Sequence, residues 1–545
     1  METLTKTLTG AQILVETLKI LGVDTIFGYP GGIVLNVYDE LFKQNDIKHY
    51  LVRHEQAAVH AAEGYARTSG KCGVVLVTSG PGATNTVTGI ADAYLDGTPV
   101  VVITGQVLEN LLHQDAFQEV DIVDITKSCS KKSFQVKSVE HLELTLIEAF
   151  NTAMSGRQGP VVVDITKNVF SEATEFRADY SINSTTEMLP DVKIPIKSIC
   201  SAKRPLIICG GGVIQSNASE ELSEFSRLLN IPVVCTMMGL GGFPASDKNY
   251  IGMVGIFGNE AANKAVNDSD LVFAVGTRFN DRIRCCFSVD DLSKKLIHLD
   301  ISKREISRVI PSAMELVGDA KLILSKMIGT IQKDQFLVDF SSFEDWCSYL
   351  SNLKSQDTVP QKRSDKIHSF ELIQQIQDYF GDKDPVISTE VGQHQVWAAR
   401  FLKFDKPRRF LTSGGLGTMG FGLPAAIGAS VAIGRKPVIC IAGDGSFQMN
   451  MQELATCVDY NIPVKIFIIN NGYLGMVRQF QEKLCDGRYF ETKISNPDYL
   501  KLAQSYGIPA VRVEKAEDIK AACKAAYDYS GPFIADIAVE PMEIL

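Results

Sequence analysis

Near the end of the chain, one turn carries the residue types that could bind a metal ion together with an anion. An apolar segment runs into Gly443-Asp444-Gly445-Ser446, and a second apolar segment runs into Asn470-Asn471. We expect both segments to be buried strands with a helix after the first, so that Asp444 and Asn471 lie at neighbouring strand ends. Carboxylate and amide oxygens suit a hard divalent cation, and the N–H groups at a helix N-terminus attract phosphate. The pattern predicts an anchor for a metal-bound diphosphate cofactor.

The alternative is structural, because an Asp-Gly turn between two buried strands is common and by itself binds nothing. The paired asparagines and the Gly-Tyr-Leu-Gly run at 472–475 favour the cofactor anchor. Together they resemble the thiamin-diphosphate motif of pyruvate-using carboligases and decarboxylases.

A second carboxylate stands where a proton donor could act. Glu55, within Arg53-His54-Glu55-Gln56, follows an expected strand and begins an alanine-rich helix. The helix dipole alone favours a carboxylate at this position, so Glu55 in isolation is better explained by a structural role. In a dry pocket, however, the same carboxyl group could exchange one proton with the nitrogen of a heterocycle.

Length and composition predict a multidomain globular protein. The 545 residues exceed a single hydrophobic core, and 45% of them are hydrophobic and 22% charged. The net charge of −10 and the lack of a basic block argue against nucleic-acid binding. We expect a cytoplasmic protein without a membrane span, because no apolar run reaches about 18 residues and no signal peptide begins the chain. Twelve scattered cysteines, with no Cys-x-x-Cys pair, predict neither a disulfide framework nor a zinc site.

Strand and helix patterns alternate along the chain, which is typical of parallel α/β sheets. We predict three doubly wound parallel-sheet domains separated by polar linkers. The predicted domains are 1–180, 196–332 and 366–545, and the predicted linkers are 181–195 and 333–365. Strands of the middle domain each end in Gly or Asp, which suits a nucleotide lying across the strand ends, although such glycines are equally consistent with structural turns.

Further motifs, in order along the chain, identify a family that the sequence resembles. They are similar to the catalytic subunit of acetohydroxyacid (acetolactate) synthase and extend from residue 9 to about 481. The resemblance implies a pyrimidine-binding first domain, an FAD-binding middle domain and a diphosphate-binding last domain. The motifs are residues 27–32, 53–56, 62–67, 78–85, 104–107, 115–119, 238–241, 391–395, 414–420 and 475–479.

The resemblance implies a site for thiamin diphosphate and Mg2+. Asp444, Asn471 and the carbonyl of Tyr473 would bind the metal, and Glu55 would protonate the aminopyrimidine ring. Without the neighbouring motif residues, Met419 would be interpreted as a residue that packs in the hydrophobic core. In this family, the methionine at this position would hold the cofactor in its bent shape. The remaining cofactor contacts would come from Gln393, His394, Gly417, Gly445, Ser446 and Met476.

A flavin site is implied in the same way. The FAD of these synthases is redox-silent, so its presence would say little about the reaction. The matching residues are Arg157, Gly210, Gly211, Gly212, Gly255, Gly276, Arg278, Asp300 and Asp319.

The implied substrate pocket includes catalytic Gln118 and Lys167, and Arg282 for the carboxylate of the second 2-keto acid. A guanidinium suits two-point contact with a carboxylate, whereas a lone arginine is more often a surface ion pair worth about 1 kcal/mol or less. Gly32 and Phe117 complete this pocket.

The acceptor side of the pocket departs from the biosynthetic pattern. Phe480 stands where biosynthetic enzymes carry a Trp that favours 2-ketobutyrate, and the sequence ends before the family's C-terminal arm. A hydrophobic pocket discriminates one methylene by only about 1 to 3 kcal/mol, so losing the Trp contact could remove much of that preference. Other departures are Ile33, Leu108, His113, Thr166, Ile256, Phe257 and Asn280.

The sequence therefore predicts an acetolactate synthase-like transferase of branched-chain amino-acid biosynthesis, which decarboxylates pyruvate and passes the two-carbon unit to a second 2-keto acid. One alternative keeps the pyruvate donor but uses another carbonyl acceptor, such as a keto-sugar nucleotide. A pyruvate oxidase or decarboxylase is disfavoured by the retained Arg282, and a non-enzymatic scaffold by the presence of Glu55 and Asp444. The resemblance implies active sites shared in a homodimer or homotetramer, and the sequence leaves a regulatory small subunit open.

Overall fold

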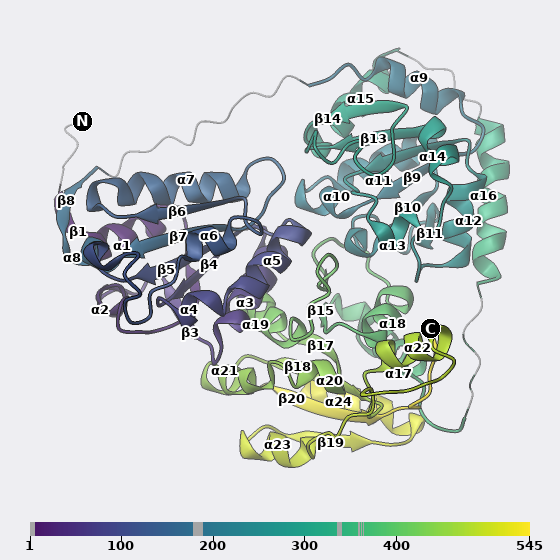
Figure 1. Ribbon diagram of the computed structural model, residues 1–545. Coiled ribbons are helices and arrows are strands. Elements are labelled where there is room, and N and C mark those ends of the chain that lie inside the picture. The colour runs from purple at the N-terminus through teal and green to yellow at the C-terminus, as the bar shows by residue number, and fades with distance from the viewer. Residues whose placement is uncertain (1–5, 178–188, 335–339, 358–359, 361, 363) are drawn as a thin grey trace.

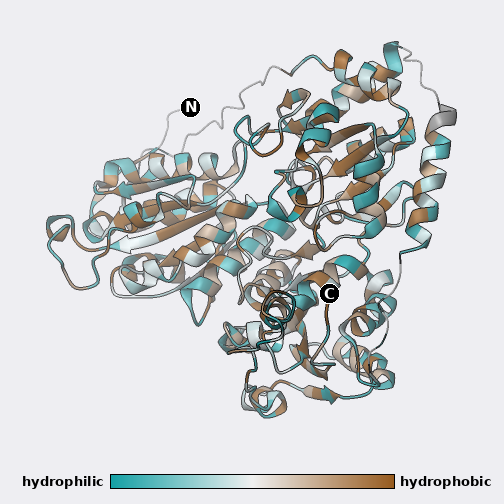
Figure 2. Ribbon diagram, turned by 45° about the vertical axis from the view of Figure 1, so that its right-hand side comes forward, coloured by the Kyte–Doolittle hydropathy of each residue, from teal (hydrophilic) through white to brown (hydrophobic). Residues whose placement is uncertain are grey.

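The computed structural model describes residues 6–177, 189–334, 340–357, 360, 362 and 364–545. Three α/β bodies follow one another along the chain, each built around a six-stranded sheet whose strand pairs are all parallel (Figure 1). Hydrophobic residues concentrate on the strands and polar residues on the outer turns of the helices (Figure 2), as expected for sheets covered on both faces. The predicted fold class of three parallel-sheet α/β domains is confirmed.

The first sheet has the strand order β3-β2-β4-β5-β7-β6. The edge strand β6 was not predicted from the sequence, because its residues, Lys-Ser-Phe-Gln-Val, are mostly half-buried and polar. The strands are β2 (Thr25–Tyr29), β3 (Lys48–Leu51), β4 (Gly73–Val77), β5 (Val100–Gln106), β6 (Lys132–Val136) and β7 (Val161–Thr166), and a separate antiparallel pair is formed by β1 (Lys6–Thr9) and β8 (Ala173–Phe176). The helices are α1 (Gly10–Ile20), α2 (Leu35–Phe42), α3 (Glu55–Ser69), α4 (Pro81–Thr84), α5 (Val87–Asp96), α6 (Ile122–Thr126), α7 (Leu142–Met154) and α8 (Lys167–Ser171).

The middle sheet has the order β11-β10-β9-β12-β13-β14. Its strands are β9 (Pro205–Cys209), β10 (Val233–Cys235), β11 (Tyr250–Met253), β12 (Leu271–Val275), β13 (Leu296–Asp300) and β14 (Met314–Val317). The helices are α9 (Lys193–Ser201), α10 (Gly211–Gln215), α11 (Ser219–Leu229), α12 (Glu260–Asp268), α13 (Asp281–Arg284), α14 (Val289–Lys295), α15 (Ala320–Asp334) and α16 (Phe340–Ser355).

The two segments predicted as linkers contain helical structure where they are described. Helix α9 begins within 181–195, and residues 178–188 lie outside the described part. Helix α16 lies within 333–365 and packs on the middle domain, where Trp346 is buried and its indole Nε1 donates to the Pro205 carbonyl at 2.9 Å. Its buried positions Phe343, Trp346 and Leu350 have helical spacing, which the polar composition of the segment obscured.

The last sheet has the order β16-β15-β17-β18-β20-β19. Strands β17 and β18 pair in register up to Gly443 opposite Ile469, so the turns that follow them lie side by side. The strands are β15 (Val386–Thr389), β16 (Phe410–Leu411), β17 (Val438–Gly443), β18 (Val464–Asn470), β19 (Ala510–Val513) and β20 (Phe533–Ala538). The helices are α17 (Ser369–Phe380), α18 (Gln393–Phe401), α19 (Gly422–Ala432), α20 (Asp444–Phe447), α21 (Leu454–Asp459), α22 (Gly475–Leu484), α23 (Tyr499–Ser505) and α24 (Ile519–Asp528).

The first and last domains share one core, centred on helices α3 and α19 (Figure 1). The two helices approach so closely that a Cβ added at Gly64 would lie 2.0 Å from the Ala425 carbonyl oxygen. A Cβ at Gly428 would lie 1.8 Å from the Ala61 carbonyl oxygen. Glycine is therefore required at both crossings, and this packing holds the first domain against the last. None of the helices in the described part of the chain is long and apolar enough to cross a membrane.

Candidate cofactor and substrate site

Asp444 lies at the start of α20, in the turn after β17, and hydrogen bonds hold its carboxylate in place. Its carboxylate is 2% exposed, and its Oδ2 accepts from the Gly472 N–H and from Asn496 Nδ2, both at 2.7 Å. Its Oδ1 accepts the adjacent Gly445 N–H at 3.1 Å. Burial raises the pKa of Asp444, and these hydrogen bonds oppose the rise, that of Asn496 first. The turn therefore presents one oriented carboxylate with N–H groups beside it.

The two asparagines after β18 have different surroundings. Asn470 is tied into the sheet, where its Nδ2 donates to Asp536 Oδ1 at 2.9 Å. Asn471 belongs to the loop next to Asp444, and its Oδ1 accepts the Tyr473 N–H at 2.9 Å. Asn496 also bridges the two turns, because its Nδ2 donates to Asn470 Oδ1 at 2.9 Å. Sequence reasoning missed Asn496: it lies 52 positions from Asp444, in a segment with no recognisable motif.

The start of α18 brings Gln393 and His394 to the same place. His394 is buried, and burial lowers its pKa to about 3, so the ring is neutral. The ring lies against the turn, because a Cβ at Gly443 would approach it to 2.7 Å. Its Nε2 is a buried nitrogen without a hydrogen-bond partner among the described residues. Gln393 Nε2 donates to Gln479 Oε1 at 2.7 Å, and Ser446 Oγ donates to the Gly443 carbonyl at 3.2 Å.

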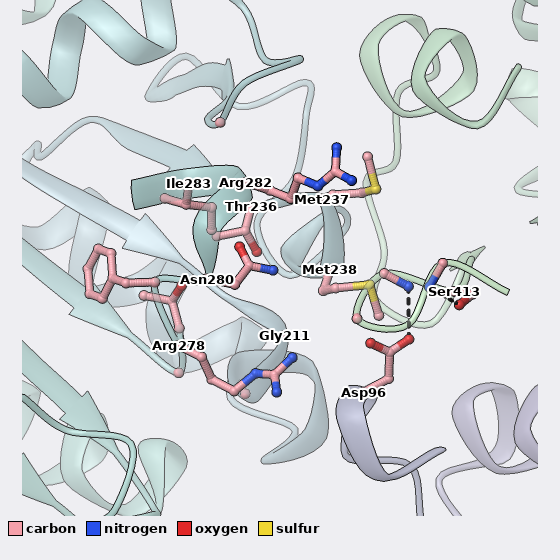
Figure 3. A pocket seen from close by; sticks show the side chains of 18 of the residues that line it. Asp96, Gly211, Thr236, Met237, Met238, Arg278, Asn280, Arg282, Ile283 and Ser413 are labelled. Atoms are coloured by element: carbon pink, nitrogen blue, oxygen red, sulfur yellow. Dashed lines mark hydrogen bonds between the residues drawn. The ribbon is translucent and has the colours of Figure 1, made fainter. Parts of the chain in front are cut away.

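A cavity of about 600 Å³ opens between the middle and last domains, with helix α5 of the first domain at its edge (Figure 3). Eight of the nine residues predicted for the flavin line it: Arg157, Gly211, Gly212, Gly255, Gly276, Arg278, Asp300 and Asp319. The ninth, Gly210, does not line the cavity and is explained by packing, since its Cβ would lie 2.1 Å from the Gly276 carbonyl oxygen.

The side of the cavity that is predicted to bind flavin holds two arginines, Arg157 and Arg278, and two aspartates, Asp300 and Asp319. The Arg157 guanidinium donates to the carbonyls of Tyr94 and Leu95 at 3.0 and 2.9 Å. Burial, and then the neighbouring Arg278, lower the pKa of Arg157. Burial raises the pKa of Asp300 to about 6. Two guanidinium groups close enough to affect each other make this part of the cavity suited to an anionic ligand.

The acceptor-side residues line the same cavity. Arg282 lies 5.8 Å from the centre of the Phe257 ring, a cation–π contact at one of the positions that depart from the family pattern. Phe480, on α22, is 41% exposed. Gly417, Met419 and Met476, predicted to contact thiamin, also line the cavity.

The other predicted catalytic residues gather elsewhere, at the carboxyl-terminal edge of the first sheet. Glu55 Oε2 accepts from Asn85 Nδ2 at 2.9 Å, so two separate motifs meet there. Gln118 has a left-handed backbone, with φ of 61°, and packs on Gly80, whose Cβ would lie 2.8 Å from the Gln118 carbonyl oxygen.

Two of these predicted residues are exposed on the first domain. Lys167 is exposed at the start of α8, Phe117 is 89% exposed, and Gly32 follows β2. None of Gly32, Glu55, Phe117, Gln118 and Lys167 lines the cavity between the middle and last domains. The predicted site residues therefore form two separate groups within one chain.

Three family models match the chain and define its class. They are the N-terminal TPP binding domain (residues 8–125), the central domain (193–327) and the C-terminal TPP binding domain (390–537) of the thiamine pyrophosphate enzymes. The fold is thus that of an enzyme that depends on thiamin diphosphate, and the Asp444 turn lies within the matched C-terminal TPP binding domain.

Full-length relatives narrow the assignment. The chain is 40% identical to the acetolactate synthase large subunit of Haemophilus influenzae, over 99% of this chain and 96% of the relative. It is 40% identical to the acetolactate synthase isozyme 3 large subunit of Escherichia coli, over 96% and 92%, and 44% identical to an acetolactate synthase of Mycobacterium bovis, over 94% and 85%. The chain belongs to the acetolactate synthase large-subunit family.

Proposed function

We propose that this protein decarboxylates pyruvate on thiamin diphosphate and transfers the two-carbon hydroxyethyl unit to a second 2-keto acid, so that two pyruvates give 2-acetolactate and CO2. When bound, thiamin diphosphate supplies the nucleophilic carbon and the electron sink for the decarboxylation. The observation that carries the proposal is the Asp444 turn, with its unpartnered buried His394 Nε2, in a chain of this family.

The residues present fit the cofactor and its metal. The buried His394 ring borders the turn where the diphosphate would lie, and Gly445 and Ser446 belong to a helical turn whose N–H groups favour phosphate. Asp444, Asn471 and the Tyr473 carbonyl would hold Mg2+, which needs oxygen ligands. Gly417, Met419 and Met476 would contact the thiamin itself from the cavity wall.

The residues also fit FAD. The cavity beside Arg157 and Arg278 is lined by Gly211, Gly212 and Gly276. The last two glycines are also required by packing, because a Cβ at Gly212 would lie 2.7 Å from Gly276 Cα. The two guanidinium charges suit the diphosphate of a dinucleotide. Bound there, FAD would act as a structural group beside the acceptor pocket.

Two copies of the chain would complete each active site. Glu55, Gln118 and Lys167 lie apart from the cavity of their own chain, and Phe117 beside them is 89% exposed. A two-fold dimer would set this edge of one copy against the Asp444 turn and cavity of the other. Glu55 would then exchange a proton with the aminopyrimidine ring of the cofactor held by the partner subunit.

The relatives' name, large subunit, supports a further partner. We infer that a small regulatory subunit binds this chain, as the printed names imply for the relatives. Copurification with the small subunit of the source organism would test this.

The acceptor is the part of the function that needs direct measurement. Arg282 is retained on the cavity wall and would hold the acceptor carboxylate, which favours a 2-keto acid. The exposed Phe480 leaves space where a larger ring would narrow the pocket. A keto-sugar nucleotide is the competing acceptor, and it would leave Arg282 without a carboxylate.

The test is product analysis of the purified protein. With thiamin diphosphate, Mg2+, FAD and pyruvate, we expect acetolactate and CO2 in equal amounts. Acceptors offered beside pyruvate should include 2-ketobutyrate and a keto-sugar nucleotide. No acetolactate from pyruvate would refute the proposal, and a strong preference for the sugar nucleotide would establish the competing acceptor.

A further inference from the structure

A glycine-rich loop, residues 413–419, lies where the three domains meet. Its residues Gly414, Gly417 and Met419 line the cavity, and a Cβ at Gly414 would approach Met238 Sδ of the middle domain to 2.3 Å. On its other side the loop faces helix α5 of the first domain, as the meeting of Ser413, Met238 and Asp96 in Figure 3 shows. With three glycines in seven residues, the loop has little intrinsic stiffness of its own.

Side-chain hydrogen bonds from α5 hold this loop. Ser413 Oγ accepts the N–H groups of Gly417 and Thr418 at 3.0 and 2.8 Å, and it donates to Asp92 Oδ1. Thr418 Oγ1 donates to the same carboxylate oxygen at 3.0 Å. One turn further along α5, Asp96 Oδ2 accepts the Gly414 N–H at 2.9 Å.

We propose that Asp92 is a positioning residue for the cofactor: from the first domain it fixes Ser413, and through Ser413 it sets the backbone that presents Gly417 and Met419 to the cavity. Asp92 acts from a distance, because it does not itself line the cavity. This inference rests on the proposed function, since it assumes that thiamin diphosphate contacts Gly417 and Met419.

A buried cluster of charged residues lies next to Asp92. Asp92, Glu63 and His60 are all fully buried, and His60 Nδ1 lies 3.0 Å from Glu63 Oε1. The Arg67 guanidinium contacts Asp96 Oδ2 at 2.8 Å and Glu63 Oε2 at 3.2 Å, so it offsets part of the negative charge.

Glu63 and Asp92 influence each other electrostatically. Burial, and then the charge of Asp92, raise the pKa of Glu63 well above its ordinary value. Burial, and then the charge of Asp96, raise the pKa of Asp92 to about 6. The Oδ1 atom of Asp92 accepts from both Ser413 and Thr418.

Four variants and one control test the inference. Asp92→Ala removes the anchor, and Ser413→Ala removes only the link between the anchor and the loop. If Asp92→Ala does not fold, Ser413→Ala still tests the inference. Asp92→Asn keeps an oxygen for Ser413 and Thr418, whereas Asp92→Leu fills the space without any acceptor. Thr456→Val is the matched control, because Thr456 Oγ1 donates to the Leu51 carbonyl at 3.1 Å across the same domain boundary but away from the loop.

Two measurements do not require turnover. In the cofactor-free protein, deuterium exchange of the peptide covering 413–419 should rise about tenfold or more in Asp92→Ala, Asp92→Leu and Ser413→Ala. Ser413→Ala removes the oxygen that accepts from the Gly417 and Thr418 amides, and the Asp92 variants release the Ser413 hydroxyl that carries it. Calorimetric titration with thiamin diphosphate and Mg2+ should give about tenfold weaker binding in these variants. Asp92→Asn and Thr456→Val should stay close to the wild type in both.

Kinetics complete the test. We expect kcat to fall in the anchor variants while the KM for pyruvate changes little, because the loop orients the cofactor rather than the substrate. Wild-type exchange and binding in Ser413→Ala and Asp92→Leu would overturn the inference. If the wild-type protein binds no thiamin diphosphate, the proposed function is refuted instead. Deuterium exchange in the cofactor-free protein would then still show whether Asp92 anchors the loop.

Discussion

Replacing Asn496 by alanine should weaken the binding of Mg2+ and thiamin diphosphate without touching either ligand. Asn496 Nδ2 donates to Asp444 Oδ2 at 2.7 Å and to Asn470 Oδ1 at 2.9 Å, so it holds the proposed metal ligand against the neighbouring strand end. In Asn496→Ala, Asp444 Oδ2 retains only the Gly472 N–H. The carboxylate then loses its charge-assisted side-chain donor and part of its orientation.

The size of the effect can be worked out from that bond. A hydrogen bond to an ionised group contributes about 1.5 to 3 kcal/mol, and about 1.4 kcal/mol corresponds to a tenfold change in affinity. Residues that orient a metal ligand alter affinity by about 10- to 100-fold. We therefore expect binding of the Mg2+–thiamin diphosphate pair to be about 10- to 100-fold weaker.

The loss should also depend on pH. The Asn496 bond lowers the pKa of Asp444, against burial, which raises it, so its removal raises this pKa further. The metal needs the ionised carboxylate, and the deficit of the variant should therefore be larger at pH 6 than at pH 8.

Calorimetric titration of thiamin diphosphate at fixed Mg2+ concentrations measures the effect. Asn249→Ala is the control, because Asn249 is a buried asparagine whose amide donates to Ser226 in the middle domain. The control should lose stability and keep wild-type cofactor affinity. Unchanged affinity in Asn496→Ala, with the protein folded, would refute the role given to Asn496 and weaken the assignment of Asp444 to the metal.

Four further changes test other parts of the site. Glu55→Gln should fold and dimerise but lower kcat by orders of magnitude, because the amide cannot exchange a proton with the cofactor ring. Arg282→Ala should raise the KM for the acceptor about tenfold or more, through loss of a two-point ion pair, while leaving cofactor binding unchanged. Phe480→Trp should increase the fraction of product made from 2-ketobutyrate when it competes with pyruvate, with an effect of about 1 to 3 kcal/mol at most. Glu390→Gln should remove a pH dependence of stability, because burial raises the pKa of Glu390 to about 7. The stability of the wild type relative to the variant should fall by about 3 kcal/mol in total as the pH rises from about 4.5 to 7, and it should stay level above pH 7.

Each of these has a clear contrary outcome. Near-normal turnover of Glu55→Gln would remove Glu55 from catalysis, and an unchanged acceptor KM in Arg282→Ala would place the acceptor carboxylate elsewhere. An unaltered product ratio in Phe480→Trp would show that this side chain does not touch the acceptor. For Glu390, urea unfolding followed by tryptophan fluorescence between pH 5 and 8 gives the comparison, and parallel wild-type and variant curves would show that Glu390 titrates normally.

Local patterns in the sequence were enough to predict the cofactor turn and the fold class. The turn at Gly443 to Ser446 depends on neighbours in the chain, and the alternation of apolar strands with helices is itself a local signal. Helix α1 (Gly10–Ile20) also depends on a local signal, because its Thr9–Gln12 capping box lies within four residues. Edge strands such as β6 and β14 are harder to predict, because they are short and partly polar and carry a weak signal.

Only the tertiary structure decided which distant groups act together. Asn496 reaches Asp444 across 52 positions, and Asp92 reaches Ser413 across 321, because parallel strand ends and the α3–α19 packing bring them together. The same packing places Glu55 away from the cavity within one chain. Sequence spacing specifies the geometry of a turn, whereas contacts between turns depend on how sheets and helices stack. The types of residue that could do the chemistry are therefore visible in the sequence, and their partners become visible only in the folded chain.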